Sequence, residues 1–326
     1  IRADVSGILR LILFLGVAIR IQSWIDRLIR EEGMDPGTTV LYTYWMDEIT
    51  FGACLAKKKY PDIIIISRVH GGDLYEERYE PPYIPFRPEI FSLIDRVYTD
   101  SGKGHEYLLN RYPGWESKMF TARLGVPGKD FRTVQSDDGV FRLVSCSNCV
   151  AVKRIDLIIR GLEKIGRMHK DQIFEWTHIG DGVLKSDIEE LAEAILPGNI
   201  KYQFLGQLPN QQVIKYYREN KIDAFINTSQ SEGTPVSIME AQSCGIPVIA
   251  SSVGGNSEIV NEANGISLSE SPSPDEIASA IWSLLLDPQL LSEKKTRSRK
   301  DWDKNYNAKR NFEKFAREIS LLTCNN

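Results

Sequence analysis

Short apolar runs alternate with amphipathic helical patterns along almost the whole of this 326-residue chain. The second half shows the pattern most regularly. Its predicted strands are residues 141–146, 174–179, 202–205, 223–227, 247–250 and 265–268. Strands that alternate with helices usually pair in parallel, because each helix carries the chain back along the sheet. The second half therefore predicts a complete doubly wound domain of about six parallel strands.

The first half shows the same alternation, but only in part. Its predicted strands are residues 40–45, 63–67, 96–99 and 118–121, with helices near 47–58 and 102–111. The first 35 residues have a helical pattern instead of an opening strand with a glycine-rich turn. We expect an incomplete domain of the same type. The predicted fold class is thus α/β, with two Rossmann-like doubly wound parallel-sheet domains, the first incomplete.

A polar segment, residues 135–139, separates the two halves. We place a first domain at residues 1–137 and a second at residues 138–303. Residues 304–326 carry apolar side chains at helical spacing, and this amphipathic helix can pack on either domain.

Composition limits the classes of partner. The formal net charge is −4, with 42% hydrophobic and 26% charged residues, which is ordinary for a globular protein. The slightly acidic balance gives no overall attraction to nucleic acid, so we expect no nucleic-acid partner. Five cysteines are an odd number, which argues against a disulfide framework and favours the reducing cytoplasm. Cys146 and Cys149 lack a second pair at zinc spacing, so we interpret them as small apolar residues.

The amino-terminal helix leaves two interpretations. Residues 11–19 are apolar, but Arg10 and Arg20 bracket only nine residues, too few to span a bilayer. We favour a core helix. The alternative is an interfacial helix that sets Arg20, Arg27 and Arg30 against lipid, giving peripheral contact with the inner face of the membrane.

Two glutamates eight residues apart, Glu232 and Glu240, form the most informative polar pair. Glu232 falls in a loop after the predicted strand 223–227, and Glu240 falls inside the following helix. Thr234 suits the N-cap of that helix and Pro235 its first position. A helix start offers unpaired N–H groups and partial positive charge, so it can bind phosphate. Carboxylates beside such a site suggest a nucleotide sugar, whose hydroxyls need acceptors near its diphosphate.

Four segments occur in a characteristic order. They are residues 145–162, the turn Ile179-Gly-Asp-Gly182, the Glu232 to Glu240 spacing, and Ser252-Val-Gly-Gly-Asn-Ser-Glu-Ile-Val260. Together they resemble the donor-binding half of the retaining glycosyltransferases of family 4, which have the GT-B fold. The likeness covers residues 140–325. In the first half, residues 67–73 and 121–126 are similar to the later part of that family's acceptor domain.

The resemblance implies a donor site in the second domain. The donor-binding candidates are Asn148, Arg154, Gly180, Asp181, Gly182, Gly233, Thr234, Pro235, Val236 and Glu240. Lys153, after the first strand of this domain, would neutralise the diphosphate. Glu232 would accept hydrogen bonds from the donor hexose, and Glu240 from the ribose. Family members commonly carry an arginine where this chain has Asn148, so either Arg154 substitutes or Lys153 acts alone.

The first domain would supply the remaining groups. His70 follows a buried strand, and the resemblance implies that it bonds a sugar hydroxyl at the reacting carbon. The alternative is a structural histidine that caps the loop. The catalytic candidates are therefore His70, Glu232 and Lys153, and the acceptor-side candidates are Arg68, Asp73 and Lys103. We expect no metal and no cofactor, since no pair of aspartates stands in a loop with histidine support.

The resemblance thus implies transfer of a hexose from a UDP- or GDP-sugar to a glycan or lipid-linked acceptor, with retention, in cell-envelope or capsular polysaccharide biosynthesis. Two alternatives remain. A nucleotide-sugar-binding protein without transfer activity would keep Lys153 and Glu240 but would not need His70. A glycoside hydrolase would need two carboxylates that straddle a scissile bond, which is disfavoured because both glutamates lie beside one phosphate site.

Overall fold

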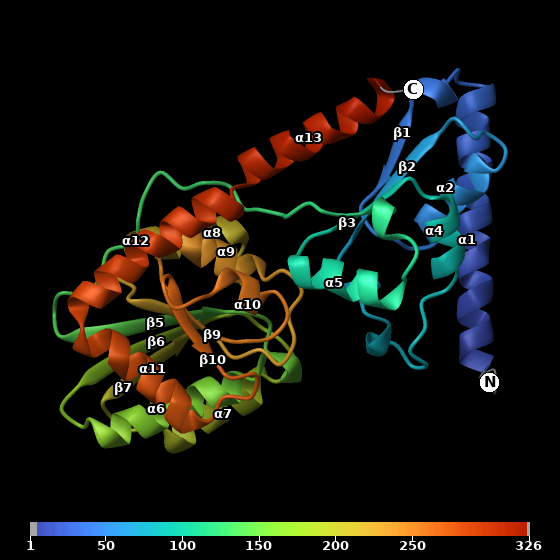
Figure 1. The fold of residues 1–326 in the computed structure, drawn as a ribbon. Coiled ribbons are helices and arrows are strands. Elements are labelled where there is room, and N and C mark those ends of the chain that lie inside the picture. Colours follow the sequence, from blue (N-terminus) through green and yellow to red (C-terminus); the bar gives the residue numbers. More distant parts are fainter. Residues whose placement is uncertain (1–4, 325–326) are drawn as a thin grey trace. The chain divides into compact units, whose positions relative to one another are not determined.

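The structure is a computed structural model that describes residues 5–324 (Figure 1). Residues 1–4 of the predicted first domain and residues 325–326 of the predicted C-terminal helix lie outside the described residues. The described chain divides into two compact units. The first contains the residues up to Leu124 together with those from Arg310 onward, and the second is Gly125–Lys309. Each unit is built on one parallel sheet, which confirms the predicted fold class.

The first unit contains a four-stranded sheet in which neighbours in the chain are also neighbours in space. Its strands are β1 (Val40–Thr43), β2 (Ile64–Val69), β3 (Arg96–Thr99) and β4 (Met119–Thr121), paired in that order. β2 is buried along its whole length, as is usual for a central strand covered on both faces. The four strands agree with the prediction of an incomplete doubly wound domain.

Helices cover both faces of this sheet (Figure 1). They are α1 (Val5–Arg30), α2 (Glu48–Lys57), α3 (Gly71–Leu74), α4 (Arg87–Leu93), α5 (Gly102–Arg111) and α13 (Ala308–Cys324), with 3-10 turns at Pro36–Thr38, Glu76–Arg78 and Glu116–Lys118. Ile65 of β2 belongs to the core that α1, α2, α4 and α5 complete. Its neighbours Ile64 and Ile66 pack on the other face against Phe315 of α13. The period of two along a strand thus divides β2 between the two layers.

α1 is one continuous helix with a buried and an exposed apolar face. Phe14, Ala18 and Ile25 are buried, as the core-helix interpretation requires. α1 approaches α2 closely, since a Cβ added at Gly52 would stand 2.6 Å from the carbonyl oxygen of Ala18. On the other face, large side chains are exposed, among them Ile8, Leu9, Ile12, Leu13, Ile19 and Trp24. The helix continues through Arg20. By its length and composition alone, the segment Gly7–Arg30 could cross a membrane, whereas the nine apolar residues between Arg10 and Arg20 could not.

The second unit contains a six-stranded parallel sheet in the order β10-β9-β8-β5-β6-β7. The strands are β5 (Val140–Cys146), β6 (Ile173–Ile179), β7 (Ile200–Phe204), β8 (Ala224–Asn227), β9 (Val248–Ser251) and β10 (Gly265–Leu268). From β5 the chain winds outward to β7, then returns to β8 on the other side of β5. The order therefore reverses between β5 and β8. In doubly wound sheets this switch point leaves a crevice at the carboxyl ends of the strands, where ligands bind.

Helices also enclose the second sheet. They are α6 (Ile155–Met168), α7 (Lys185–Ile195), α8 (Asn210–Glu219), α9 (Val236–Ser243), α10 (Asn256–Ile259), α11 (Pro274–Leu286) and α12 (Pro288–Asn305), with a 3-10 turn at Ala151–Lys153. α6 and α11 pack tightly, because a Cβ at Gly161 would lie 2.4 Å from the Ile277 side chain. Trp302 of α12 lies in the core on the opposite face, with α8 and α9. The sheet thus lies between two cores.

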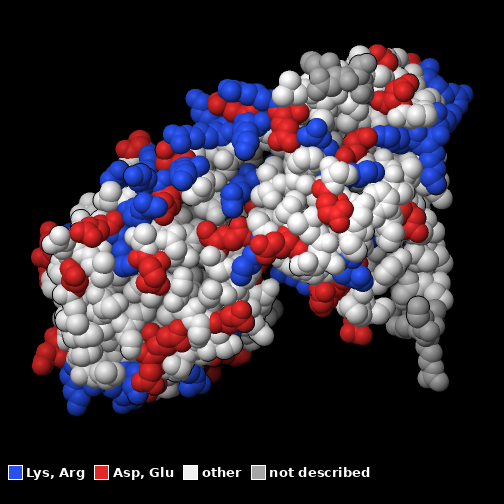
Figure 2. Space-filling model, viewed as in Figure 1, with Lys and Arg blue, Asp and Glu red and all other residues white. Residues whose placement is uncertain are grey.

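Charged side chains of both signs are interspersed over the visible surface, with Lys and Arg gathered along α12 (Figure 2). This helix contains Lys295, Arg297, Arg299, Lys300 and Lys304, as well as the buried Lys294. A chain with a net charge of −4 can therefore still present a local basic surface.

Candidate functional site

The switch point of the second unit brings Lys153 and Glu232 together. Lys153 ends the 3-10 turn that follows β5, and Glu232 lies in the loop between β8 and α9. Lys153 Nζ stands 2.6 Å from Glu232 Oε1, and the side chains are 22% and 11% exposed. An ammonium and a carboxylate thus meet at the carboxyl end of the sheet, as expected for a ligand site of this architecture.

Two further side chains fix the Glu232 carboxylate. Ser229 Oγ donates to Glu232 Oε1 at 2.6 Å, and Asn227 Nδ2 donates to the same oxygen at 3.2 Å. Asn227 Oδ1 in turn accepts from the backbone N–H of Ser229 and from Nδ2 of the buried Asn256. These polar residues were not among the predicted site residues. Their positions at the end of β8, beside the predicted site loop, are a signal that could have identified Asn227 and Ser229.

Two adjacent glycines support the backbone of the Glu232 loop. Gly254 has φ +45°, and a Cβ there would lie 1.9 Å from the carbonyl oxygen of Glu232. A Cβ at Gly255 would lie 2.0 Å from the carbonyl oxygen of Gly233, to which the Gly255 N–H donates at 3.0 Å. The motif at residues 252–260 therefore acts by letting one loop pack directly against another.

The helix that follows Glu232 begins one residue later than the sequence suggested. Pro235 is its N-cap, with an extended backbone (φ −76°, ψ 101°), and Val236 is the first helical residue. The Pro235 carbonyl accepts the N–H of Met239, as an N-cap residue does. The prediction of Thr234 as N-cap was therefore wrong. Thr234 Oγ1 is buried and has no hydrogen-bond partner within residues 5–324.

Glu240 lies on α9, on the side that approaches α8. Asn210 Nδ2, at the start of α8, donates to Glu240 Oε1. Burial raises the pKa of the Glu240 carboxyl, and the hydrogen bond from Asn210 offsets part of that effect. The carboxylate is thus costly to keep ionised, yet one amide donor orients it.

Gly180 and Gly182 allow two loops of the second unit to run side by side. A Cβ at Gly180 would lie 1.8 Å from the carbonyl oxygen of Ser147, and one at Gly182 would lie 2.6 Å from that of Cys149. The two glycines therefore let the chain approach its own backbone closely. Asp181 between them accepts the N–H of Gly182 and lies 3.4 Å from Lys185 Nζ.

Arg154 forms hydrogen bonds to the protein backbone. Its guanidinium donates to the carbonyl oxygens of Thr228, Ser229 and Glu270 at 2.6, 2.8 and 2.8 Å. These bonds tie the loop after β8 to the start of α6. Asn148 is exposed and contributes its carbonyl to the N–H of Val150.

In the first unit, His70 follows β2 and caps α3. It is 7% exposed, and its ring packs against those of Tyr44 and Trp45 at centroid distances of 4.4 and 4.8 Å. Nδ1 lies 3.1 Å from Oδ2 of Asp100, which follows β3. Nε2 is buried and has no partner in the described part of the chain. A carboxylate that holds the Nδ1 proton leaves Nε2 as an acceptor for a ligand hydroxyl. Asp100 was not among the predicted site residues.

The acceptor-side candidates have different surroundings. Asp73 accepts the N–H groups of Met46 and His70 at 2.6 and 2.7 Å, and burial raises its pKa. Arg68 is 1% exposed, with its guanidinium 4.4 Å from the Phe315 ring beneath α13, so it lies in a packing position and not at a ligand surface. Lys103 is exposed in the first turn of α5. Of the three, Asp73 contacts His70 directly.

Among residues 5–324, no three His, Cys, Asp or Glu side chains are grouped so that they could hold a metal ion. The site that the structure does build consists of Lys153, Glu232 and their supporting loops.

Comparisons with known proteins point to one family. The model of the family described as "Glycosyl transferases group 1" matches residues 128–307. An uncharacterised glycosyltransferase of Methanocaldococcus jannaschii is 30% identical over 142 residues, which are 43% of this chain and 37% of the relative. The GDP-mannose-dependent monoacylated alpha-(1-6)-phosphatidylinositol monomannoside mannosyltransferase of Corynebacterium glutamicum is 30% identical over 152 residues, 45% of this chain and 38% of the relative. The matches thus span well under half the length of these relatives.

A solved structure shows the same fold. The Anabaena protein HepE, in complex with UDP and glucose, matches with a TM-score of 0.70 at 16% identity. The match covers 93% of this chain and 81% of HepE.

Proposed function

Since the chain belongs to the group 1 glycosyl transferases, a family of the GT-B fold, we propose that it transfers a hexose from a nucleoside diphosphate sugar to an acceptor hydroxyl, with retention of anomeric configuration. The observation that carries the proposal is the contact between Lys153 and Glu232 at the switch point. This contact supplies a cation for a diphosphate and an acceptor for sugar hydroxyls within one loop cluster.

The donor diphosphate would lie at the start of α9. The segment from Gly233 to Val236 would surround it, and Lys153 would balance its charge. Negative charge grows on the diphosphate as the glycosidic bond breaks, so a fixed ammonium lowers the barrier. Glu232 would accept hydroxyls of the hexose, and Glu240 those of the ribose. When the donor is bound, the Lys153 ammonium would then contact both Glu232 and the diphosphate.

His70 of the first unit would contact the hexose near the reacting carbon. Its Nε2 would accept a hydroxyl of the hexose near the reacting carbon, while Asp100 holds Nδ1. Retention would follow from attack by the acceptor hydroxyl on the face that the diphosphate leaves. The departing phosphate oxygen takes the acceptor proton, so no protein nucleophile is needed. The proposal includes no metal and no cofactor, because Lys153 and the helix start supply the positive charge.

The donor would be a UDP- or GDP-sugar. The relative from C. glutamicum is described as GDP-mannose-dependent, and the HepE structure contains UDP and glucose. The acceptor would be a glycan or a lipid-linked sugar of the cell envelope or capsule. We place the protein in the cytoplasm, in peripheral contact with the inner membrane face through the exposed apolar residues of α1.

The proposal is tested by transfer reactions with a panel of UDP- and GDP-sugars. Release of free nucleotide together with a new α-linked product from an α-linked donor, identified by its NMR coupling constants, is expected. Nucleotide release that yields an inverted product would contradict retention. Donor binding without release, with any acceptor in a glycan panel, would favour a binding protein over a transferase.

A further inference from the structure

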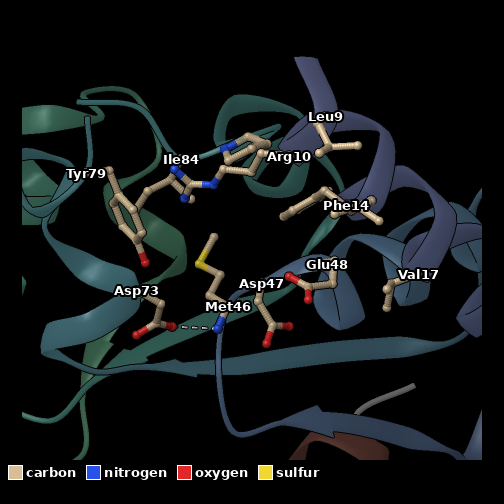
Figure 3. A pocket seen from close by; sticks show the side chains of 12 residues that line it. Leu9, Arg10, Phe14, Val17, Met46, Asp47, Glu48, Asp73, Tyr79 and Ile84 are labelled. Atoms are coloured by element: carbon tan, nitrogen blue, oxygen red, sulfur yellow. Dashed lines mark hydrogen bonds between the residues drawn. The ribbon is translucent and has the colours of Figure 1, made fainter. Parts of the chain in front are cut away.

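A cavity of about 430 Å³ opens at the carboxyl edge of the first unit's sheet (Figure 3). Its lining comes from α1, from the segment that follows β1, from the start of α2, from Asp73 after β2, and from Tyr79, Ile84 and Pro85 before α4. Ligand pockets commonly have volumes of about 300–1,000 Å³, and doubly wound sheets bind ligands at this edge. The cavity therefore has both the size and the place of a ligand site.

One side of the cavity is acidic. Figure 3 shows the carboxylates of Asp47, Glu48 and Asp73 along this side. Asp47 Oδ1 caps α2 by accepting the N–H of Ile49 at 2.9 Å, and Asp73 is bonded to two backbone N–H groups. The Glu48 side chain has no hydrogen bond or ion pair with any of residues 5–324. Its carboxylate is thus the acceptor that remains open to a ligand.

Another part of the lining is apolar. Leu9, Leu13, Phe14 and Val17 line the cavity from successive turns of α1, and Figure 3 shows Leu9, Phe14 and Val17. Phe14 is buried, whereas Leu9 and Leu13 are 56% and 62% exposed. The apolar wall therefore continues from the cavity onto the surface of the helix, which gives an apolar chain a path out of the cavity.

The balance of charge in the cavity disfavours an anion. Arg10 is the one basic residue of the lining, and its guanidinium stacks over the Tyr79 ring at 4.2 Å. Three carboxylates thus face one cation that is already in a cation–π contact. A phosphate would be repelled, whereas hydroxyl groups can donate to Glu48 and Asp47.

Resting on the proposed function, we infer that this cavity binds the acceptor and that the acceptor is an uncharged glycoside with an apolar aglycone. The sugar hydroxyls donate to Glu48 and Asp47, and the aglycone lies against Leu9, Leu13 and Phe14. The cavity adjoins the proposed catalytic histidine, because Asp73 of its lining accepts the N–H of His70. An acceptor sugar held here lies beside the group proposed to act on the donor hexose.

Calorimetric titration of the full chain with three probes tests this inference: methyl β-glucoside, decyl β-glucoside and decyl phosphate, each below its micelle concentration. Decyl glucoside is expected to bind about tenfold more tightly than methyl glucoside, because its chain covers apolar surface. Decyl phosphate is expected to bind more weakly than decyl glucoside. Equal binding of the two glucosides, tighter binding of decyl phosphate, or no measurable binding of either glucoside would overturn the inference.

Variants separate the two sides of the cavity. Leu13→Ser is expected to remove most of the preference for the decyl chain, while Leu286→Ser, equally exposed in the second unit, leaves it unchanged. Glu48→Gln should weaken both glucosides several-fold, with Glu89→Gln as the control on α4. Unchanged binding in Leu13→Ser and Glu48→Gln would also overturn the inference.

Titration of the same preparations with UDP- and GDP-sugars distinguishes this failure from failure of the proposed function. Nucleotide-sugar binding with no glucoside response rejects the acceptor cavity alone. Absence of nucleotide-sugar binding rejects the proposed function at the second unit.

Discussion

The two units differ in how completely each has built its site. In the second unit the Glu232 carboxylate is held by Lys153, Ser229 and Asn227, and its loop is packed against two glycines. In the first unit His70 is held through one carboxylate and two aromatic rings. The nearby cavity has an apolar wall that extends onto an exposed helix.

This difference indicates a division of labour. A dense polar network fixes geometry, which suits recognition of a constant diphosphate and ribose. An open cavity with an apolar wall tolerates variation, which suits acceptors of differing structure. The second unit should therefore determine donor affinity, and the first should determine which acceptor reacts and how fast.

The largest expected effect is that of Lys153→Met. Removal of the ammonium takes away charge stabilisation of the leaving diphosphate and leaves Glu232 without its cation. Turnover should fall about 10³-fold, measured as nucleotide release at saturating acceptor. Lys170→Met, at an exposed position after α6, is the matched control and should retain full turnover. A loss of less than tenfold in Lys153→Met would contradict the claim that Lys153 stabilises the leaving diphosphate.

Gly254→Ala tests whether the packing of two loops forms the donor site. The added Cβ would meet the Glu232 carbonyl oxygen at 1.9 Å, at a backbone conformation with φ +45°. The free energy of unfolding should fall by about 3 kcal/mol, measured by denaturant titration, and donor binding should weaken with it. Gly198→Ala, where a Cβ meets nothing within 4 Å, should change stability by about 0.5 kcal/mol or less. Equal effects at both glycines would refute the packing argument.

His70→Ala sharpens the contrast from the side of the first unit. Loss of the Nε2 acceptor should lower kcat about 10²-fold. Donor affinity, measured by calorimetry, should fall far less than kcat, because the donor diphosphate and ribose are held by the second unit. His169→Ala, whose ring stacks on Trp282, is a control that should retain kcat. A large loss of donor affinity in His70→Ala would show that the division between the units is wrong.

Glu240→Gln should give the smallest effect, and it depends on pH. Burial raises the pKa of Glu240 above its unfolded value. The folded state therefore binds the proton more tightly, so the native carboxyl favours stability at low pH and loses this contribution as pH rises through its folded pKa. The variant should melt about 2 °C higher than the native chain at about pH 7, with no difference at about pH 3. Donor binding should nonetheless weaken in the variant. A melting difference that grows as pH falls would contradict the burial argument.

Much of the fold could be predicted from local pattern. The strands of both units were predicted to within about two residues, and the central ones, such as β2 and β8, are continuous apolar runs because they are buried on both faces. α1 was harder. Its length and helical character follow from its pattern, but which of its apolar residues are buried depends on α2, and that contact is set by Gly52 and Ala18.

The site residues divide in the same way. The contact between Lys153 and Glu232 joins two loops that the order of strands places together, so a family resemblance can locate it. Asp100 beside His70 could not be identified by local pattern, because the contact is formed between neighbouring strands. The three backbone carbonyls that accept hydrogen bonds from Arg154 could not be predicted from sequence, because they lie in loops far away along the chain. The start of α9 moved by one residue because Pro235 adopts an extended conformation.

The central claim is that the donor binds at the switch point of the second unit. Hydrogen–deuterium exchange of the full chain, with and without each of a panel of UDP- and GDP-sugars, tests it most directly. At least one nucleotide sugar should slow exchange in the segment from Thr228 to Glu240 and in the turn Ala151–Lys153, while β2 and β3 stay unchanged. Nucleotide-dependent protection confined to the first unit, or none in the segment from Thr228 to Glu240, would contradict the account.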